Sequence, residues 1–409
     1  MNGPDSIVIV GGGHAGAQLC ASLAASHQGA RIDLVCEEAD LPYHRPPLSK
    51  SYVKHPEETP QLHRSAAWYA QAGIRVHQAD PAIAIDRHAR TLHLRSGATL
   101  HYQWLVLATG TRARQLPHLR ADLDNVLVLR NAADAQRLRE RLPVMQRLTV
   151  LGGGFIGLEV AATAQALGKQ VQVLEAAPRL LMRSASVELA AHVLQSHRAS
   201  GIEVELGATV DDFKIEANRL VSLRVNGVQQ PVDQLLLGIG ALPEMTLAEA
   251  CGLACGNGIA VDASMRTSDP AILAIGDCAL FPGLRASGAL RLESVQNAND
   301  QAKVAAATML DQPQTYQAVP WFWTEQGSLR IQMAGLLPKN GSCWRRPGKD
   351  ETSFSLLHYE QGELRCVESV NAPADHMGAR KLLEAGVSPA AERACDPALA
   401  LRSLAMPDG

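Results

Sequence analysis

The sequence predicts an α/β fold built from two similar parallel-sheet domains, followed by a small α+β domain. Two of the three supporting observations are glycine clusters. One directly follows an apolar run near the N-terminus, and a second with the same surroundings comes about 140 residues later. The third is a change in pattern from about Pro320, where strand-like runs no longer alternate with helix patterns. Strands that alternate with helices indicate parallel sheets covered on both faces.

The first glycine cluster predicts a Rossmann-like dinucleotide-binding turn. It follows the apolar strand expected over 7–10 and reads Gly11-Gly12-Gly13-His14-Ala15-Gly16. In such a turn the first glycine permits a tight bend, the second lets the backbone approach a pyrophosphate, and the third lets the next helix pack on the strand. The helix N-terminus favours the phosphate charge. Glu37 follows the strand expected over 31–35, roughly 20 residues on, where an acid accepts hydrogen bonds from a ribose.

The second glycine cluster has the same surroundings. It follows the apolar strand expected over 148–151, precedes a helix pattern over 155–167, and reads Gly152-Gly153-Gly154-Phe155-Ile156-Gly157. Glu175 ends the next predicted strand, over 171–174. One such cluster alone can be a glycine-rich turn, but here each copy has a strand, a helix and an acid in the expected order. We therefore expect two Rossmann-like domains, two bound dinucleotides and electron transfer between them.

Further elements follow along the chain. The predicted segments are, in order, strands over 105–107, 235–237 and 272–275 closed by Gly110, Gly240 and Asp277, a helix over about 297–310, strands over 329–334, 354–358 and 364–370, and a helix over 376–384. The last four indicate a small α+β domain. We expect the tail beyond about Pro397 to be weakly ordered.

Composition excludes several classes of function. The chain has 409 residues, which suggests two or three domains, and its net charge of −3 argues against a nucleic-acid binder. No apolar stretch approaches the roughly 18 residues that span a bilayer. The first strand begins almost at once, which leaves no room for a signal peptide and predicts a cytoplasmic protein. The eight cysteines form neither a disulfide framework nor a metal-binding spacing, so no metal is expected.

Further motifs, together with both glycine clusters, indicate a family. In order they are Leu-Pro-Tyr-His-Arg-Pro-Pro-Leu-Ser-Lys at 41–50, Ala-Thr-Gly at 108–110, Ala-Ile-Gly-Asp at 274–277, Glu-Ser-Val at 293–295 and Pro-Trp-Phe-Trp-Thr-Glu-Gln at 320–326. The chain resembles the FAD-dependent NADH:ferredoxin reductases of bacterial oxygenase systems, of the putidaredoxin reductase and biphenyl dioxygenase reductase type. This resemblance covers essentially the whole chain. It implies a glutathione reductase fold, with an FAD-binding domain over 1–112 and 241–319, an NAD-binding domain over 113–240 and a C-terminal domain over 320–409.

The resemblance also implies roles for single residues. The FAD contacts it implies are Gly11, Gly13, Ala15, Gly16, Glu37, Lys50, Ala82, Thr109, Gly110, Arg130, Asp277, Val295, Trp321 and Trp323. The NADH contacts it implies are Gly152, Gly154, Ile156, Gly157 and Glu175. Lys50 would lie beside the flavin ring and Glu159 near the nicotinamide, where the two could pair, and we take both as catalytic candidates.

Each of these residues also has a plain structural interpretation. Lys50 could be a surface lysine, and Asp277 could cap a helix. Glu159 could belong to a packed helix, although an unpaired carboxylate there would be costly. Trp321 and Trp323 could be part of the core of the C-terminal domain.

The implied reaction is hydride transfer from NADH to FAD, followed by single-electron transfer to a 2Fe–2S or Rieske-type ferredoxin. That ferredoxin would feed a mono- or dioxygenase, for example in aromatic hydrocarbon catabolism. A thiol relay is not expected, because residues 43–50 and 110–239 contain no cysteine. Glu175 favours NADH, since its carboxylate would repel the 2′-phosphate of NADPH.

Partner recognition stays open, and so do alternative functions of two classes. We expect a transient ferredoxin complex and a monomer or weak homodimer, without nucleic acid or membrane. Four basic residues are expected in one loop, either as a docking patch or as a solvated surface: Lys339, Arg345, Arg346 and Lys349. Within the same fold, the alternatives are an NADH oxidase, a rubredoxin reductase or a monodehydroascorbate reductase. From another class, the alternative is a flavin-bearing interaction protein under redox control.

Overall fold

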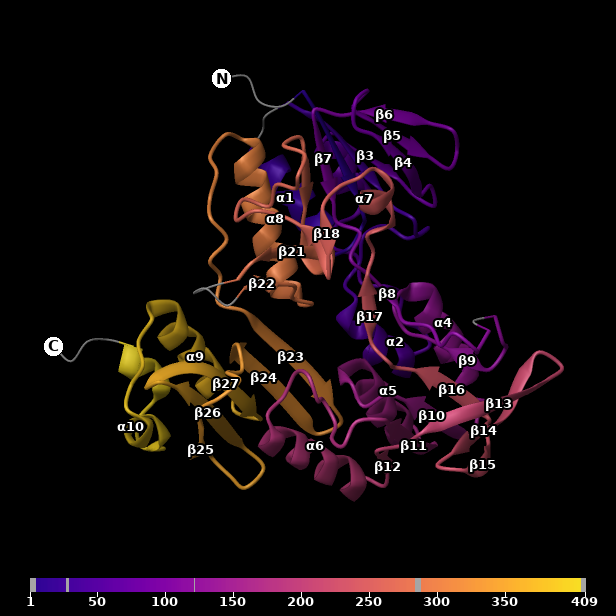
Figure 1. Cartoon of the computed structure of the whole chain (residues 1–409), viewed down its shortest axis with the longest axis vertical. Helices are drawn as coiled ribbons and strands as arrows, with labels where there is room; N and C mark the ends of the chain where they lie inside the picture. The colour runs from indigo at the N-terminus through magenta and orange to yellow at the C-terminus, as the bar shows by residue number, and fades with distance from the viewer. Residues whose placement is uncertain (1–4, 27–28, 121, 284–287, 406–409) are drawn as a thin grey trace. The chain divides into compact units, whose positions relative to one another are not determined.

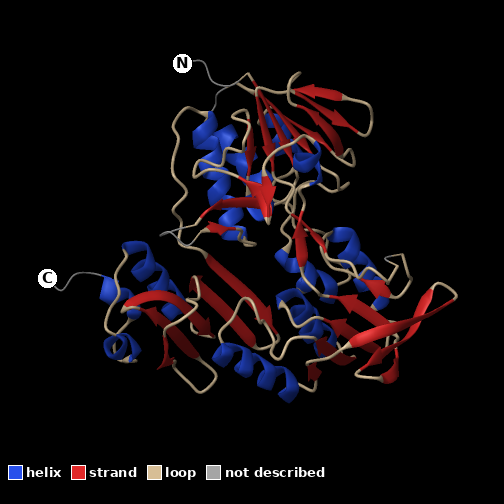
Figure 2. Cartoon of the chain, viewed as in Figure 1, coloured by secondary structure: helices blue, strands red, loops and turns tan. Residues whose placement is uncertain are grey.

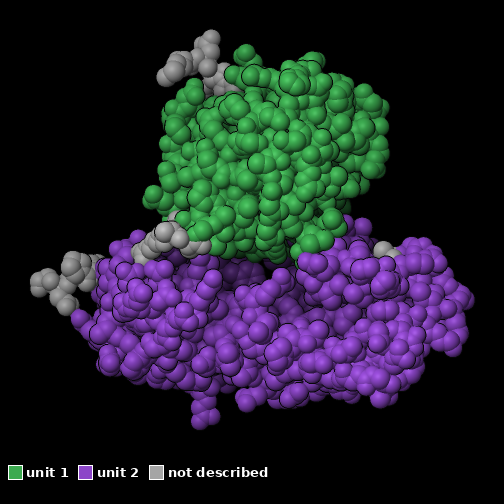
Figure 3. All heavy atoms as spheres, in the orientation of Figure 1, with its two compact units in different colours: residues 1–45, 60–112, 241–318 green, residues 46–59, 113–240, 319–409 purple. Residues whose placement is uncertain are grey.

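A computed structural model describes residues 5–26, 29–120, 122–283 and 288–405. The chain divides into two compact units (Figure 3). Unit 1 comprises residues 1–45, 60–112 and 241–318, and unit 2 comprises residues 46–59, 113–240 and 319–409. The expected division into an FAD-binding, an NAD-binding and a C-terminal domain stays a prediction. Both units mix helices and strands (Figure 2).

Unit 1 is built on a five-stranded parallel sheet. Its strands, in spatial order, are β20 (Ile272–Ala274), β7 (Trp104–Leu107), β1 (Ser6–Val10), β2 (Arg31–Val35) and β3 (Ile74–His77). Helix α1 (His14–Ala25) packs against α8 (Val295–Met309) (Figure 1), and both share one apolar core with the sheet. The β1 run Ile7–Val10 is buried, as expected of a central strand of a parallel sheet.

Smaller elements complete unit 1. They are the antiparallel sheet of β4 (Ala82–Asp86), β5 (Thr91–Leu94) and β6 (Thr99–His101), the sheet of β18 (Cys255–Gly256), β19 (Gly258–Ala260), β21 (Ala279–Pro282) and β22 (Ala289–Leu290), the helices α3 (Ala66–Gln71) and α7 (Thr246–Ala250), and the 3₁₀ turn η2 (Gly276–Cys278). The short strands β8 (Thr111–Ala113) and β17 (Ala241–Pro243) pair with each other.

Unit 2 contains a second parallel sheet of the same kind. Its order is β12 (Glu203–Leu206), β11 (Gln170–Glu175), β10 (Arg147–Leu151), β16 (Gln234–Leu237) and β9 (Val126–Leu127). The helices of this part are α2 (Ser51–Lys54), α4 (Ala132–Arg141), α5 (Phe155–Ala166) and α6 (Val187–Ala199), and the turn η1 (Pro46–Ser49) precedes α2. An antiparallel sheet of β13 (Val210–Glu216), β14 (Arg219–Val225) and β15 (Val228–Pro231) lies within the same segment of the chain.

The C-terminal part of unit 2 is an antiparallel sheet with helices. The strand order is β23 (Trp321–Gln326), β24 (Leu329–Gly335), β27 (Glu363–Val370), β26 (Phe354–Glu360) and β25 (Ser342–Pro347). Helix α9 (Pro373–Ala385) packs on β24 and β27, and α10 (Ala391–Cys395) and the turn η4 (Leu401–Ala405) follow it. The predicted fold class, α/β with two Rossmann-like sheets and a small α+β region, is confirmed. No described helix is both long and apolar enough to cross a bilayer.

Two local expectations are wrong. The basic residues expected in one loop are not, because Arg345 and Arg346 belong to β25. Arg346 is also buried, where its guanidinium bonds Asp375 and three backbone carbonyls. The tail is ordered up to Ala405, because Leu401 and Leu404 of η4 are buried in the C-terminal core. Residues 406–409 lie outside the described part.

Candidate active site

The first glycine loop has two positions that only glycine can occupy. Gly11 has a φ of +115°, and a Cβ built there would lie 2.2 Å from the carbonyl oxygen of Ala108. A Cβ on Gly16 would lie 2.0 Å from the carbonyl oxygen of Gly11. Gly13 differs, because a Cβ there would meet nothing within 4 Å. The outer two glycines therefore hold the turn, and the middle one faces open space.

The N-terminus of α1 is suited to an anion. Its N-cap is Gly13, which supplies no side-chain hydrogen bond, and its first turn carries no acidic residue. The N–H groups of a first helical turn lack partners inside the helix, and the dipole adds positive potential there. With open space at Gly13, a pyrophosphate fits this helix end.

Several other predicted FAD residues flank this loop. Ala15 is buried in α1, and a Cβ on Gly276, whose φ is +78°, would lie 3.1 Å from the Cβ of Ala15. This close approach places η2, which carries Asp277, next to α1. A Cβ on Gly11 would also lie 3.3 Å from the backbone nitrogen of Thr109. Thr109 in turn donates from Oγ1 to the carbonyl oxygen of Glu244 at 2.6 Å, while the Glu244 N–H donates to the carbonyl of Gly110 at 2.9 Å.

The remaining predicted FAD residues lie elsewhere. Glu37 is exposed, two residues beyond the end of β2. Ala82 begins β4, and Val295 begins α8, whose N-cap is Ser294. Lys50, Arg130, Trp321 and Trp323 belong to unit 2.

The second glycine loop repeats the first. Gly152 has a φ of +107°, and its Cβ would lie 2.4 Å from the carbonyl oxygen of Gly238. A Cβ on Gly157 would lie 2.7 Å from the carbonyl oxygen of Gly152. At Gly154 the nearest atom is 3.8 Å away, and Gly154 caps α5 without a side-chain hydrogen bond. A second pyrophosphate therefore fits the start of α5.

Glu175, at the end of β11, is held by this loop. Its Oε2 accepts from the Gly153 N–H at 2.5 Å, and its Oε1 accepts from the Ala177 N–H at 2.7 Å. Ile156, in the first turn of α5, is 47% exposed. The loop thus presents both a fixed carboxylate and an apolar side chain.

Lys50 and Glu159 form an ion pair within unit 2. The Lys50 Nζ lies 2.7 Å from the Oε2 of Glu159, whose side chain is 4% exposed. Lys50 follows η1, and Glu159 lies in the second turn of α5. Lys50 also donates to the carbonyl oxygen of Pro46 at 3.2 Å. The lysine side chain is 19% exposed, so the pair is nearly buried but reaches the surface at the lysine.

Sequence reasoning missed the residues that hold Glu159. Ser49 Oγ donates to its Oε2, and Thr324 Oγ1 donates to its Oε1 at 2.7 Å. Thr163 Oγ1 donates to the Ser49 carbonyl at 2.9 Å, which fixes η1 on α5. Ser49 and Thr324 both lie in the motifs that indicated the family, and membership of these motifs was the one sequence signal that could have pointed to them.

The tryptophans of β23 are partly buried. The ring centroids of Trp321 and Trp323 lie 5.6 Å apart, and the guanidinium of Arg380 lies 4.5 Å from the Trp321 ring centroid. Trp321 packs against the C-terminal core. The structural interpretation of Trp321 as part of the core therefore holds. A flavin contact of Trp321 would be a second role beside this packing.

Arg45 of unit 1 is a charged residue that the sequence did not single out. Its guanidinium lies 2.6 Å from the Oε1 of Glu38, and Tyr43 donates its hydroxyl to the same carboxylate. Burial acts to lower the pKa of Arg45, but the charges of Tyr43, Glu38 and Asp277 raise it overall. Arg45 is thus a fixed cation whose surroundings include Asp277.

Comparison with known proteins identifies the family. Residues 5–302 match the pyridine nucleotide-disulphide oxidoreductase family, and residues 321–405 match the reductase C-terminal family. Rhodocoxin reductase of Rhodococcus erythropolis is 39% identical over 96% of this chain and 92% of its own length. The solved ferredoxin reductase for the CYP199A2 system from Rhodopseudomonas palustris has a TM-score of 0.94 at 39% identity, over 98% of this chain and 100% of that chain. The covalent putidaredoxin reductase–putidaredoxin complex has a TM-score of 0.93 at 33% identity, over 98% of each chain.

These matches extend over both glycine loops, the Lys50–Glu159 pair and the C-terminal sheet. They confirm the resemblance drawn from the sequence motifs. The chain therefore belongs to the pyridine nucleotide-disulphide oxidoreductase family, within its ferredoxin reductases.

Proposed function

We propose that this protein is an FAD-dependent NADH:ferredoxin oxidoreductase that supplies single electrons to a 2Fe–2S or Rieske-type ferredoxin of a mono- or dioxygenase system. The observation that carries the proposal is the pair of glycine loops, each followed by a helix whose N-terminus is not capped by a side chain. Two dinucleotide sites in a chain that matches ferredoxin reductases over nearly its whole length support transfer between NADH and FAD.

In this proposal the first loop holds FAD. Gly11, Gly13 and Gly16 let the backbone approach its pyrophosphate, and the N–H groups at the start of α1 donate to the phosphate oxygens. Further FAD contacts come from Ala15, Glu37, Ala82, Thr109, Gly110, Arg130, Asp277 and Val295. When bound, FAD supplies a ring that takes up a hydride and gives up electrons one at a time.

The second loop binds NADH. Gly152, Gly154 and Gly157 serve the pyrophosphate as in the first loop. The backbone N–H groups of Gly153 and Ala177 hold the Glu175 carboxylate in place, and its oxygens retain lone pairs for ribose hydroxyls. A 2′-phosphate would meet this negative charge, so NADH is preferred over NADPH.

Lys50 and Glu159 place a fixed charge pair near the reacting rings. Ser49 and Thr324 orient the carboxylate, which in turn holds the lysine ammonium. A cation held in place without reorganisation stabilises negative charge that develops beside it, and this is the contribution we assign to Lys50.

The partner is an acidic ferredoxin in a transient complex. One relative was solved as a covalent complex with putidaredoxin, and this chain has a TM-score of 0.93 to it. Trp321 and Trp323 of β23 are proposed to lie toward the flavin ring. Of the four basic residues considered for docking, Arg346 is buried and is no longer a candidate. Lys339, Arg345 and Lys349 are exposed and remain candidates. Charge complementarity of this kind acts mainly on the association rate.

Two further assignments belong to the same proposal. The FAD-binding domain spans 1–112 and 241–319, the NAD-binding domain spans 113–240, and the C-terminal domain spans 320–409. The protein acts in the cytoplasm, where NADH is available and where thiols stay reduced. All eight cysteines are free in the structure, which supports a reducing compartment.

Anaerobic reduction followed by acceptor competition tests the proposal. NADH should bleach the bound flavin faster than NADPH does, and a 2Fe–2S ferredoxin should restore the colour faster than oxygen does. Restoration by oxygen alone would indicate an NADH oxidase, and restoration by rubredoxin or the monodehydroascorbate radical would indicate those reductases. Very slow bleaching with a long-lived NADH complex would indicate a redox-controlled interaction protein.

A further inference from the structure

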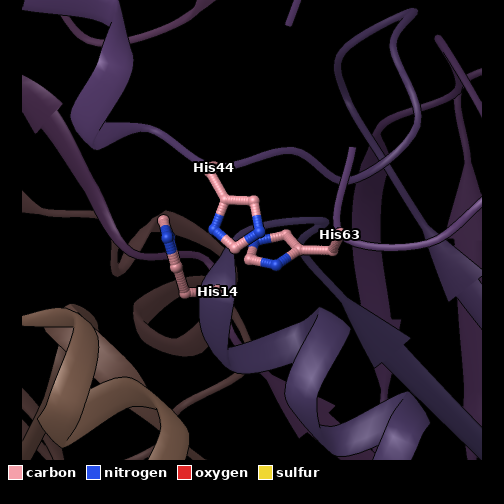
Figure 4. Close-up of side chains that lie close together, drawn as sticks. All are labelled: His14, His44 and His63. Carbon is pink, nitrogen blue, oxygen red and sulfur yellow. The ribbon is translucent and has the colours of Figure 1, made fainter. Parts of the chain in front are cut away.

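Three histidine side chains from distant points of the sequence gather in unit 1 (Figure 4). They are His14 at the start of α1, His44 in the loop before η1, and His63 just before α3. The ring centroids of His44 and His63 lie 3.9 Å apart, and those of His14 and His63 lie 4.7 Å apart. One ring nitrogen from each histidine can be chosen such that all three lie within 4.8 Å of one another.

The backbone holds two of these histidines in place. The His44 N–H donates to the carbonyl of Gln61 at 2.8 Å, and the His63 N–H donates to the carbonyl of Pro42 at 2.8 Å. An isolated antiparallel bridge joins Tyr43 to Leu62 between them. The third histidine, His14, is fixed by the first helical turn and is buried. The backbone positions of all three histidines are therefore set by the bridge and by the start of α1.

The donor set decides which ion could bind. Neutral imidazoles suit Zn²⁺, Cu²⁺ and Ni²⁺, whereas Mg²⁺ and Ca²⁺ require oxygen ligands. A Zn–N bond of about 2.1 Å places tetrahedral ligand nitrogens about 3.4 Å apart. The nitrogens here lie within 4.8 Å, so small side-chain rotations bring them onto one ion. Three ligands leave a fourth position for water.

Local charge opposes a metal ion, because the cations Arg64 and Arg45 act on the His63 ring and would repel a second cation. Arg45 is balanced by Glu38 at 2.6 Å, so Arg64 is the main opposing charge.

We propose that His14, His44 and His63 form a binding site for one divalent transition-metal ion of the Zn²⁺ class. One ligand, His14, belongs to the first glycine cluster, and the other two, His44 and His63, lie outside both clusters. The proposal does not depend on the function proposed above, because binding is measured without NADH or ferredoxin.

Calorimetric titration with ZnCl₂ of the purified full chain, after treatment with a chelator, tests the site. One ion per chain should bind, with a Kd on the order of 1 µM or tighter. His44→Gln and His63→Gln should each weaken binding by at least about 100-fold, because even outer-shell changes cost 10–100-fold. The matched control is His88→Gln, an exposed histidine of the same unit, which should leave the affinity unchanged.

Two more measurements sharpen the test. Arg64→Ala removes the opposing cation and should tighten Zn²⁺ binding by about 2- to 5-fold. Co²⁺ should give the visible absorption of a four-coordinate site in the unaltered chain and lose it in H44Q and H63Q. A Zn²⁺ Kd weaker than about 1 mM, or one equal in the unaltered chain, H44Q and H63Q, would overturn the proposal and leave the rings as a packing cluster.

Discussion

The two glycine loops have the same backbone conformation but differ in the side chains that surround it. In both, the first glycine has a positive φ, +115° at Gly11 and +107° at Gly152. In the first loop the next helix begins with buried residues, including Ala15, whereas in the second Ile156 is 47% exposed. A buried helix start fits a ligand that stays bound, and an open one fits a ligand that exchanges.

The acids that follow the loops differ as well. Glu37 is exposed, while Glu175 accepts two backbone N–H hydrogen bonds from Gly153 and Ala177. Helix α5 also carries Glu159, which is paired with Lys50, whereas α1 carries no acidic residue. The comparison shows that the two loops share the glycine turn and differ in the side chains around it. We propose that these side chains decide which dinucleotide each loop binds.

The largest effects are expected from alanine at the first glycine of each loop. G11A and G152A both force a Cβ toward a backbone carbonyl, at 2.2 and 2.4 Å, and require a positive φ of alanine. Each should lower the free energy of unfolding by about 3 kcal/mol or more. G11A should also abolish FAD retention, whereas G152A should keep the flavin and lose its reduction by NADH. Flavin content and urea unfolding measure this, and equal flavin loss in both variants would remove the proposed difference between the loops.

Both the stability of unit 2 and flavin reduction should depend on the ion pair between Glu159 of α5 and Lys50. E159A leaves the nearly buried Lys50 ammonium without its carboxylate and should lower the free energy of unfolding by about 2 kcal/mol, after allowance for the partial exposure of the lysine. Flavin reduction by NADH should slow by at least about 10-fold. T324V removes one hydrogen bond to Glu159 and should cost about 1 kcal/mol. Unchanged reduction rates in both variants would contradict the role assigned to the pair.

Unit 2 should also lose stability as the pH rises. Burial acts to lower the pKa of His358, but hydrogen bonds to Cys343 and Glu368 and the Glu368 charge raise it to about 9. Glu368 also accepts from the Ser186 N–H at the start of α6, which links the C-terminal sheet to this helix. Because the folded pKa lies above the unfolded value of about 6.5, the stabilisation is complete below pH 6.5 and is lost as the pH rises through about 9.

The loss should be about 2 kcal/mol, measured by urea unfolding between pH 6 and 10. His358→Gln should flatten this pH dependence. If the H358Q variant lost as much stability between pH 6 and 10 as the unaltered chain, the pH dependence would belong to other groups.

The smallest effects are expected from neutralising Glu175 and Glu37, and they should differ between the two residues. E175Q should raise the Michaelis constant for NADH by about 5-fold, which corresponds to about 1 kcal/mol of binding free energy. It should also reduce the preference for NADH over NADPH. E37Q should leave both nucleotide constants unchanged and lower only the retention of FAD. An unchanged NADH-to-NADPH ratio in E175Q would count against its assignment.

The parts predicted from the sequence are those fixed by local patterns. The strands β1 and β10, the turns at Gly11 and Gly152 and the helix α5 follow from apolar runs and glycine spacing, which act over a few residues. The hydrogen bonds that Ser49 and Thr324 make to Glu159 join residues 110 and 165 positions apart, and no local pattern encodes them.

Two further features show the same limit. The sequence predicts Arg346 in a basic loop, yet it lies in β25, where Asp375 and three backbone carbonyls satisfy its guanidinium. The cluster of His14, His44 and His63 depends on a bridge between segments 42–44 and 61–63, which only the tertiary structure creates.

The most direct test is to mix the purified protein anaerobically with NADH and then with a 2Fe–2S ferredoxin while following the flavin absorbance. We predict a yellow protein that NADH bleaches, and whose colour returns as the ferredoxin becomes reduced. A protein that stays colourless when supplied with FAD, or a flavin that NADH does not reduce, would contradict the assignment of the two loops.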